Sequence, residues 1–570
     1  MVGPDPLDVV IEDGRIVRIV AAGEGHGEET INGARCLLVP GMINGHFHSH
    51  EHFQKGHFDN LTLELWMNFV RPPKPPTLTS RQVYLRTLIG AIEAIRSGTT
   101  TVVDDVNIGA ALDREHLAAI HQAYEEIGIR ALVGVSMMDR PFFEALPFVD
   151  EEFEPDLLDE LRQAHVASAE RLLALAEELA LTRHPKANRV GFIVSPSAPQ
   201  RCTDGFLKAL RALADRYDLP VMIHAQETRL QVVTGLLASG KTHIERLDEI
   251  GFLKPATAIV HGVWLTPNEI GLLARSGATV QHNPWSNLRL GSGVAPVRAL
   301  LDAGVNVSVA TDGCSSTDTC NLLNSVGLAA ALHTLRGTHA EWVHAREAFQ
   351  AATAGGAKAL GRTQELGVIE EGAIADLVLY RLDSAPFVPQ GDLIQQLVYA
   401  ERGASMETSL VEGRPVFLHG RFVGIDEAAI LAERLGSPAG GRHQSLPCQT
   451  QRLRSRCDLG RLRRKHLRCL GRSDFADFVY IRPIASHRHV GCARRAGVAL
   501  GRRRRNIVCH RDSRGVPSRR ILASARFRHC VDRPDAVAAD RSYPGSVQGG
   551  RSVQSGTVRR AVSHDGSATC

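Results

Sequence analysis

The sequence lacks any run of 18 consecutive apolar residues, and its first 25 residues contain no apolar core of the kind that a signal peptide needs. We therefore expect neither a membrane span nor a secretory leader. Cysteine is also scarce, because residues 1–440 contain only four, at scattered positions: Cys36, Cys202, Cys314 and Cys320. Such sparse cysteines are typical of a reducing compartment, so a cytoplasmic protein is expected.

Residues 441–570 lack glutamate altogether and contain a single lysine, yet they hold 28 arginines against 8 aspartates. The formal charge of +4 therefore combines a basic end of +21 with an acidic body of −17. Clustered arginines can neutralise phosphates, which would make this end a nucleic-acid-binding arm. Such arms usually mix lysine with arginine, and no periodicity appears here, so we favour a frameshifted, non-native or disordered tail. Nucleic acid is accordingly not the expected partner.

Short apolar segments alternate with helical patterns through the body of the chain. The eight segments expected to be strands are 36–39, 100–103, 131–135, 190–194, 221–223, 258–260, 279–281 and 307–310. One intervening helix is well delimited by Thr266 as N-cap, Pro267, Glu269 as capping-box partner and Gly277 as terminator. Eight strands alternating with helices predict an α/β fold, a (β/α)8 TIM-like barrel, whose chemistry lies at the carboxyl ends of the strands.

Both ends of the body carry signals for a small β-domain. Residues 8–20 read as a hairpin, because Asp13-Gly14 is a strong turn signal between β-branched runs. Similar runs return at 377–380 and 408–417. The predicted division is therefore a composite β-domain, a barrel and a tail, with the boundaries 1–37 plus 363–437, 38–362 and 438–570.

Ionisable residues stand first after five of the eight predicted strands. In chain order they are His46 with His48, His224, His261, His282 and Asp312. Alternate residues of a strand point to the same face, so His46 and His48, about 7 Å apart, can share one metal ion if further ligands join them. A lone His-x-His is usually chance or structural. Five strand ends that direct His or Asp to one mouth instead predict a metal-dependent active site.

Five motifs in this order resemble the amidohydrolase superfamily, and within it the cytosine deaminase and chlorohydrolase-like branch. They are P-G-M-I-N-G-H-F-H at 40–48, H-A-Q-E-T at 224–228, H-G-V-W-L at 261–265, H-N-P-W-S-N-L-R-L-G-S-G at 282–293 and T-D-G at 311–313. The segment 367–380 is similar to the strand pair that returns to the small β-domain of the family. The resemblance covers roughly residues 8–437 and is specific for the superfamily rather than for a substrate.

The resemblance implies a site for one divalent metal ion, with the ligands His46, His48, His224 and Asp312. Glu227, His261 and Asp312 would be the catalytic residues. Relatives with two metal ions use a carboxylated lysine at the end of the fourth strand, and 191–197 contains no lysine, which favours a single ion. Three nitrogens and one carboxylate suit Zn²⁺, which we prefer, although Fe²⁺ is compatible.

A metal ion in such a site lowers the pKa of water to about 7 and makes hydroxide available at neutral pH. Asp312 and His261 would orient it, and Glu227 would protonate a ring nitrogen and then the leaving amine. This chemistry predicts an amidohydrolase acting on non-peptide C–N bonds, most simply by deaminating a nitrogen heterocycle such as a pyrimidine, purine, pterin or triazine. The alternatives are a chlorohydrolase or cyclic-amide hydrolase with the same site, nucleic-acid binding through the tail, or an inactive product of a frameshifted gene.

Substrate contacts are expected from loops. Trp66 would stack on a planar ring, and Gln200 or Arg201 would recognise a carbonyl or carboxylate, although each residue equally suits packing or a solvated position. His282 would contact substrate or only fix the turn at Asn283 and Pro284. The partner is thus a small heterocyclic substrate, and the dimers common in the family extend the expectation to a homodimer.

Other polar residues near the motifs have no expected catalytic role. His50, His52 and His57 follow the first motif and are expected at the surface, while Asp104 and Asp105 are expected only to cap a loop. Family members usually begin with a further strand before the equivalent of the 8–20 hairpin. Its absence here predicts a small β-domain that is short of one strand.

Overall fold

The computed structural model describes residues 6–70, 77–141, 155, 158–159, 166–335 and 337–436. The chain divides into units 1–474 and 475–570, and all described residues belong to the first unit. The expectations for the tail fall outside the described residues. Within the described part, no helix combines the length and apolar character needed to cross a membrane.

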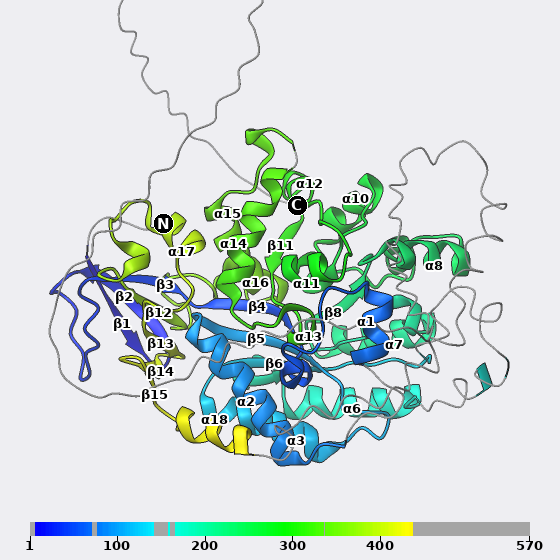
Figure 1. The fold of residues 1–570 in the computed structure, drawn as a ribbon, viewed down its shortest axis with the longest axis horizontal. Coiled ribbons are helices and arrows are strands. Elements are labelled where there is room, and N and C mark those ends of the chain that lie inside the picture. Colours follow the sequence, from blue (N-terminus) through cyan, green and yellow to red (C-terminus); the bar gives the residue numbers. More distant parts are fainter. Residues whose placement is uncertain are drawn as a thin grey trace, which may run out of the picture. The chain divides into compact units, whose positions relative to one another are not determined.

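Two four-stranded parallel sheets form the centre of the fold, and helices pack around them (Figure 1). Their hydrogen-bonded orders follow the chain, β4-β5-β6-β7 and β8-β9-β10-β11. The strands are β4 (Met42–Phe47), β5 (Thr99–Val106), β6 (Arg130–Val135), β7 (Val190–Phe192), β8 (Val221–Ala225), β9 (Thr257–His261), β10 (Thr279–His282) and β11 (Asn306–Val309).

Helices separate most of these strands, as the alternating sequence pattern predicts. The α-helices are α1 (Leu63–Val70), α2 (Ser80–Arg96), α3 (Arg114–Ile127), α6 (Ala169–Thr182), α7 (Asp204–Arg216), α8 (Arg229–Ser239), α9 (His243–Glu249), α10 (Pro267–Ser276), α11 (Pro284–Arg289), α12 (Val297–Asp302), α13 (Cys314–Thr317), α14 (Leu322–Leu332), α15 (Ala345–Ala351), α16 (Ala354–Ala359), α17 (Leu393–Tyr399) and α18 (Glu427–Gly436). The short 3-10 helices are η1 (Ser49–Gln54), η3 (Pro199–Arg201), η4 (His333–Leu335), η5 (His339–Glu341) and η6 (Ala385–Phe387).

Contacts between the two parallel sheets are consistent with a TIM-like barrel. A parallel bridge joins Val194, just after β7, to Val221 at the start of β8. On the opposite side, the Asp312 backbone N–H donates to the His46 carbonyl at 3.1 Å. Inward-facing side chains from successive strands form one buried cluster, which also takes in residues of the segment that follows: Ile43, Val103, Leu132, Ile193, Met222, Ala258, Val260, Ala357, Leu360, Leu366 and Ile374.

The first predicted strand differs from the observed one. The apolar run at 36–39 forms β3 (Cys36–Pro40), which pairs antiparallel with β12 outside the parallel sheets, and the first parallel strand is β4. Gly41 separates the two strands, and a Cβ there would lie only 2.1 Å from the Thr100 hydroxyl oxygen. The chain therefore changes sheets at a residue that only glycine can occupy, which an uninterrupted apolar run conceals. The other seven predicted strands are observed with shifted ends.

The residues predicted to begin and end helix α10 are the ones observed. Thr266 is its N-cap and forms a reciprocal capping box with Glu269, Pro267 occupies the first turn, and Gly277 ends the helix with a φ of 71°. Helix α2 begins in the same way, with Thr79 as N-cap in a reciprocal capping box with Gln82. Each cap satisfies backbone N–H groups that have no partner within the helix.

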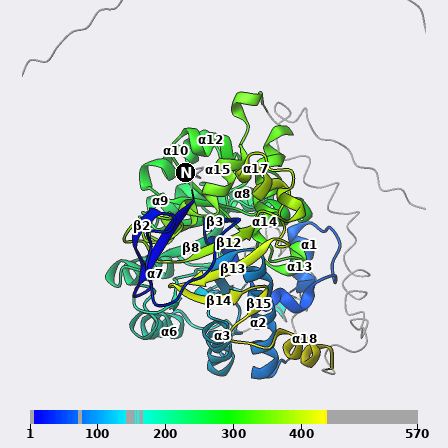
Figure 2. The same ribbon diagram turned by 90° about the vertical axis from the view of Figure 1, so that its left-hand side faces the viewer.

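The smaller β-structure draws on both ends of the body, as Figure 2 shows. A five-stranded antiparallel sheet has the order β15-β14-β13-β12-β3, and a separate hairpin pairs β1 with β2. Besides β3, the strands of this β-structure are β1 (Leu7–Glu12), β2 (Arg15–Ala21), β12 (Leu377–Arg381), β13 (Met406–Val411), β14 (Arg414–Leu418) and β15 (Arg421–Phe422). The Ile16 N–H donates to the Ala373 carbonyl at 2.9 Å, so the hairpin lies beside the chain that leads into β12.

A buried ion pair connects this β-structure to the parallel sheets. Arg130, at the start of β6, donates from Nε and a terminal nitrogen to the two carboxylate oxygens of Asp376 at 3.0 and 3.2 Å. Their side chains are only 4% and 2% exposed. The same guanidinium contacts Glu412 at 3.0 Å, but the Glu412 side chain is 40% exposed.

We expect Asp376→Ala to lower the free energy of unfolding by about 3–5 kcal/mol, because it leaves the buried Arg130 charge without its bidentate partner. Glu412→Gln is the matched control on the same guanidinium, and it should cost less than about 1 kcal/mol because Glu412 is exposed. Urea unfolding of both variants measures the difference. Equal costs for the two substitutions would contradict a structural role for the buried pair.

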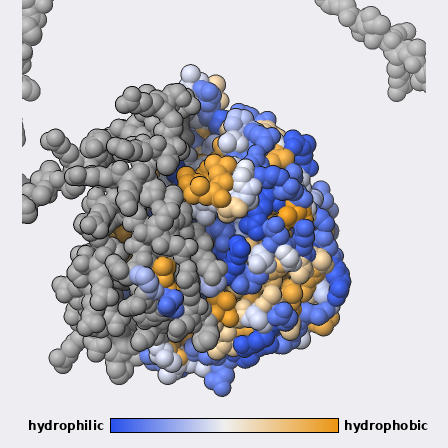
Figure 3. Space-filling model, turned by 90° about the vertical axis from the view of Figure 1, so that its right-hand side faces the viewer, coloured by the Kyte–Doolittle hydropathy of each residue, from blue (hydrophilic) through white to orange (hydrophobic). Residues whose placement is uncertain are grey.

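Apolar side chains are exposed on the side of the molecule where α8 lies (Figure 3). Val233, Leu236 and Leu237 of α8 are 42%, 47% and 61% exposed. The helix begins directly after Thr228, its N-cap, and thus directly after the predicted H-A-Q-E-T motif. The exposed apolar face therefore adjoins the predicted active site along the chain.

Candidate active site

Three predicted histidine ligands meet at the carboxyl ends of the parallel strands. His46 lies near the end of β4, His48 directly follows it, and His224 lies near the end of β8. One donor atom from each of the three lies within 4.8 Å of the others. The Nε2 atoms of His46 and His224 are 3.2 Å apart. As the strand-end argument predicts, His46 and His48 thus meet His224, which lies 176 or more positions further along the chain.

Asp312 completes this group from the end of the last parallel strand. Its Oδ1 atom lies 3.5 Å from His46 Nε2 and 3.4 Å from His48 Nε2. Asp312 has a φ of 66°, a conformation that non-glycine residues adopt only when surrounding contacts hold it. Its N–H bond to the His46 carbonyl and the bond from the Gly313 N–H to Oδ1, at 2.7 Å, supply those contacts.

Backbone carbonyls orient two of the imidazole rings. His48 Nδ1 lies 2.7 Å from the Asp105 carbonyl oxygen, and His224 Nδ1 lies 2.7 Å from that of Ser197. A carbonyl only accepts, so each Nδ1 carries the hydrogen and each neutral ring turns its Nε2 lone pair towards the centre. Converging lone pairs repel one another unless a cation lies between them. The arrangement therefore fits a bound metal ion.

The electrostatics of the site favour neutral rings at two of the three histidines and a charged carboxylate at Asp312. Burial lowers the pKa of His46 to about 4 and that of His224 well below its ordinary value. Burial opposes ionisation of Asp312, but the His46 hydrogen bond and the charges of His46, His48 and His261 together outweigh it, so the pKa of Asp312 is lowered well below its ordinary value. For His48, burial is outweighed by the charges of Glu51, Asp312 and Asp105 together with the Asp105 hydrogen bond, which raise its pKa, so a proton competes with a metal ion for this ring more than at His46 or His224.

Glu227 and His261 lie beside these four residues. His261 Nε2 is 3.6 Å from Glu227 Oε2 and 3.9 Å from Asp312 Oδ2, while its Nδ1 is 2.9 Å from Asn287 Oδ1. Burial raises the pKa of the Glu227 carboxyl, with His261 opposing that change. Glu227 Oε1 is buried and has no hydrogen-bond partner among the described residues. A carboxylate held in this way can exchange a proton with a bound molecule.

The three loop residues predicted to contact substrate have different surroundings in the structure. Arg201, on η3, is 7% exposed and donates to the Ser197 hydroxyl at 3.0 Å, and its charge acts on Glu227. Gln200 is also buried, at 9% exposure. Trp66 belongs to an apolar cluster on α1 and its Nε1 lies 3.4 Å from the Ser315 carbonyl oxygen. The structure thus places the Arg201 charge within reach of Glu227 and places Trp66 in the apolar cluster around α1.

His282 does not belong to the group of His46, His48 and His224, whose donor atoms lie within 4.8 Å of one another. Its ring packs edge-to-face against His333, with centroids 5.5 Å apart. Burial lowers its pKa to about 3, so the ring is neutral. Both of its nitrogens are buried without a hydrogen-bond partner in the described part of the chain.

Two expectations for polar residues near the motifs were wrong. Asp104 and Asp105 do more than cap a loop, because both are fully buried and the Asp105 carbonyl orients His48. Asp104 accepts hydrogen bonds from the Ser49 N–H at 2.8 Å and the Tyr124 hydroxyl at 2.6 Å. These aspartates also lie near the end of a strand, β5, so the strand-end rule that selected the candidate ligands applies to them as well.

The second correction concerns the histidines after the first motif. His57 is exposed as predicted and His50 is partly exposed, but His52 is only 4% exposed. Its ring lies beside the sulfurs of Cys314 and Cys320. Spacing gave no signal for this placement, because the two cysteines lie more than 260 residues further along the chain.

Comparison with known proteins identifies the family. The model of the amidohydrolase family matches residues 37–416. A 5-methylthioadenosine/S-adenosylhomocysteine deaminase from Thermococcus sibiricus is 34% identical over 411 residues, covering 72% of this chain and 89% of the relative. A 5'-deoxyadenosine deaminase from Methanocaldococcus jannaschii is 34% identical over 426 residues, covering 74% and 94%.

Solved structures agree with this result. A zinc-bound adenosine deaminase from Xanthomonas campestris is similar with a TM-score of 0.67 at 28% identity, covering 75% of this chain and 92% of its own. A zinc complex of atrazine chlorohydrolase from Arthrobacter aurescens has a TM-score of 0.68 at 26% identity, covering 75% and 94%. The predicted family and the predicted hydrolase class are confirmed. On the strength of its motifs, its site geometry and these relatives, the chain belongs to the amidohydrolase family.

Proposed function

We propose that this protein is a metal-dependent hydrolase that removes the exocyclic amino group of an aminated nitrogen heterocycle, with an adenosine-type nucleoside as the first choice of substrate. The observation that carries the proposal is the position of the buried Glu227 and His261 beside Asp312 and the converging histidines. The names of the relatives support the substrate class, because they are deaminases of adenosine derivatives.

In this proposal a single divalent metal ion is held by the residues that converge at the strand ends, His46, His48, His224 and Asp312. Zn²⁺ is preferred over Fe²⁺, since the nitrogen and carboxylate donors suit zinc and zinc is present in the related structures. When bound, such an ion supplies Lewis-acid activation of the attacking water. The absence of a lysine near the end of β7 supports one ion rather than two.

The protein residues then move the protons of a hydrolytic deamination. Glu227 accepts a proton from the attacking water and delivers it to the ring nitrogen next to the amino-bearing carbon. Oxygen bonds to that carbon, and the freed carboxylate then takes the remaining proton from the new hydroxyl and passes it to the amino group. The C–N bond breaks, the carbon becomes a carbonyl, and ammonia leaves. His261, whose Nδ1 contacts Asn287 Oδ1, and Asp312 orient the attacking water.

Substrate recognition is proposed for four further residues. Arg201 and Gln200 bind polar groups of the ligand from η3, Trp66 contacts its planar ring, and His282 supports or contacts it as a neutral imidazole. The burial of Arg201 near Glu227 supports this assignment most directly. A buried guanidinium there would recognise an anionic or carbonyl oxygen.

At the level of organisation, we propose that the eight parallel strands close into one barrel spanning 38–362. The small β-domain then comprises 1–37 and 363–437, and 438–570 is a tail without a role in the reaction. The bridge at Val194 and the hydrogen bond from Asp312 to His46 support closure. A cytoplasmic homodimer completes the proposal, and the four free cysteines of the described residues support the reducing location.

Ammonia release by the zinc-loaded full-length chain tests this function. Adenosine, 5'-deoxyadenosine and 5'-methylthioadenosine are the first substrates, with guanine for comparison. We expect ammonia in stoichiometric amounts with the deaminated product from at least one adenosine derivative. Because a chlorohydrolase is among the similar structures, chloride release from atrazine is measured in parallel. Chloride without ammonia would replace the deaminase by a chlorohydrolase.

A further inference from the structure

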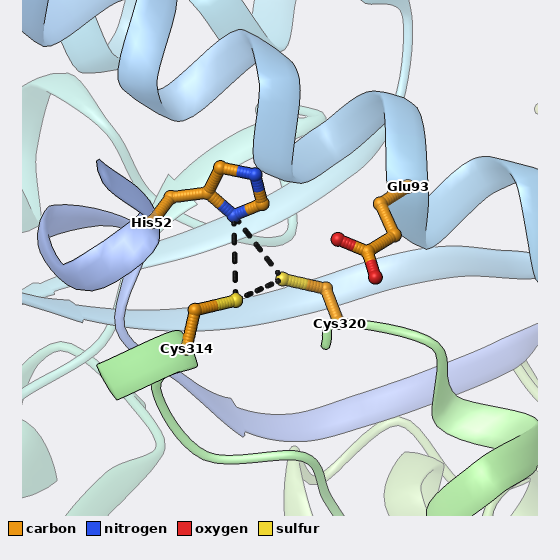
Figure 4. A group of neighbouring side chains, drawn as sticks. All are labelled: His52, Glu93, Cys314 and Cys320. Atoms are coloured by element: carbon orange, nitrogen blue, oxygen red, sulfur yellow. Dashed lines mark hydrogen bonds between the residues drawn. The ribbon is translucent and has the colours of Figure 1, made fainter. Parts of the chain in front are cut away.

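A second group of potential metal ligands lies outside the proposed active-site donors. His52 Nδ1 is 3.4 Å from Cys314 Sγ and 3.5 Å from Cys320 Sγ, and the two sulfurs are 3.2 Å apart (Figure 4). One donor atom from each of these residues and from Glu93 lies within 4.8 Å of the others. The function proposed above uses none of these four side chains.

The donors come from three separate segments and are well enclosed. His52 lies on η1, Glu93 on α2, and Cys314 opens α13, six residues before Cys320. His52 is 4% exposed and both cysteines are fully buried, while the Glu93 side chain is 26% exposed at the outer edge. A lone buried cysteine is usually inert, but two thiols and an imidazole in mutual contact form a ligand set.

The distances correspond to the edges of a tetrahedral thiolate–imidazole site. Zinc bonds of about 2.3 Å to sulfur and about 2.0 Å to nitrogen place tetrahedral S···N pairs about 3.5 Å apart and S···S pairs about 3.8 Å apart. The observed S···N separations match, and a small movement of the sulfurs would reach the second value.

Charge balance favours a divalent ion at this position. Two thiolates and the Glu93 carboxylate around a divalent cation leave one negative charge, and the Lys55 ammonium that pairs with Glu93 neutralises it. The Thr319 hydroxyl donates to Glu93 Oε1 at 2.7 Å and orients the carboxylate. Partners of this kind in the outer shell hold the ligands of protein metal sites in place.

We propose that His52, Cys314, Cys320 and Glu93 form a second, structural metal site for a thiophilic divalent ion, with Zn²⁺ as the physiological choice. Two of its ligands follow residues of the proposed active site closely, since His52 comes four positions after His48 and Cys314 two after Asp312. The second ion would therefore fasten η1 to α13 and fix the spacing of those two active-site residues. This site is independent of the substrate, so it stands even if the proposed deamination fails.

Cobalt substitution of the full-length protein distinguishes the two sites. The proposed active-site donors are nitrogen and oxygen only, so a thiolate-to-cobalt charge-transfer band reports the cysteine site. We expect the wild type to show this band and to bind one more Co²⁺ per chain than C314S/C320S. Cys202→Ser is the matched control, because Cys202 is buried elsewhere and contacts the Met137 carbonyl. The cysteines after residue 440 are identical in all three proteins and cancel in the comparison.

His52→Gln provides a second test that keeps both thiols and does not depend on folding of the double variant. We expect it to weaken Co²⁺ binding at least about 10-fold and to change the charge-transfer band, in line with the loss of a ligand. Equal cobalt content and an unchanged band in wild type, C314S/C320S and H52Q would overturn the second site. A Cys314–Cys320 disulfide found by mass spectrometry in protein isolated without oxidant would overturn it as well.

Discussion

Replacing Glu227 with glutamine is expected to lower kcat for ammonia release by about 10²- to 10⁴-fold while the bound metal is retained. Glutamine has nearly the same shape but cannot accept and return a proton. Glu227 is proposed to act beside the metal ligands rather than as one of them, and its contact at 3.6 Å is with His261. Ammonia assays and metal analysis of the same preparations measure the two effects.

The control for this variant is Glu249→Gln, which changes the same functional groups at an exposed ion pair with Lys241. It should leave kcat within about twofold of the wild type, because exposed pairs contribute little. Loss of metal from Glu227→Gln would make Glu227 a ligand instead of a proton carrier. Unchanged kcat would remove it from the reaction altogether.

Replacing Asp312 with asparagine is expected to weaken metal binding by about 10²-fold or more and to reduce turnover accordingly. The substitution preserves size but removes the negative charge that lies 3.4–3.5 Å from His46 and His48. The negative charge of Asp312 compensates the free-energy cost of holding a cation in a buried site away from water. Metal affinity measured by competition with a chelator, at fixed pH, gives the effect directly.

Asp302→Asn serves as the control for this second variant, because Asp302 is exposed and pairs only with Arg298 on the same helix among the described residues. It should bind metal as the wild type does. If Asp312→Asn bound metal with wild-type affinity, the carboxylate would not belong to the donor set. If it bound metal normally but lost turnover, Asp312 would act only on the substrate or water.

Hydrophobic periodicity and the residues that begin and end helices were sufficient to predict much of the fold. Seven of the eight strands in the parallel sheets and the caps of α10 follow from local patterns, because alternation, N-cap residues and terminal glycines act over a few positions. The apolar run at 36–39 was assigned to the wrong sheet. Its partner β12 lies more than 330 residues further on, and pairing across that distance leaves no mark in the local sequence.

The candidate site was predictable to the extent that strand ends determine it. His46, His48, His224 and Asp312 lie at or just beyond the carboxyl ends of β4, β8 and β11, so their meeting follows from parallel topology. The groups that orient them were not predictable in the same way. The carbonyls of Asp105 and Ser197 are backbone atoms, and backbone atoms are present at every position regardless of the side chain.

The cluster of His52, Glu93, Cys314 and Cys320 could not be predicted from the sequence either, although its residue types were visible there. Its residue types are typical metal ligands, but they lie on three segments of different local structure, so no spacing rule connects them. The first motif predicts ligand roles for His46 and His48 but none for His52, which was therefore expected at the surface. Only the packing of η1 against α2 and α13 brings it inside.

Chelation followed by zinc reconstitution, with ammonia as the readout, tests the central claim of a metal-dependent deaminase most directly. The full-length chain is stripped of metal, shown to remain folded, and assayed with the adenosine derivative that gave the highest rate before and after Zn²⁺ is restored. We predict that ammonia release disappears on stripping and returns with zinc. Ammonia release at the full rate from the metal-free protein, or none from folded, zinc-loaded protein with any aminated heterocycle, would contradict the account.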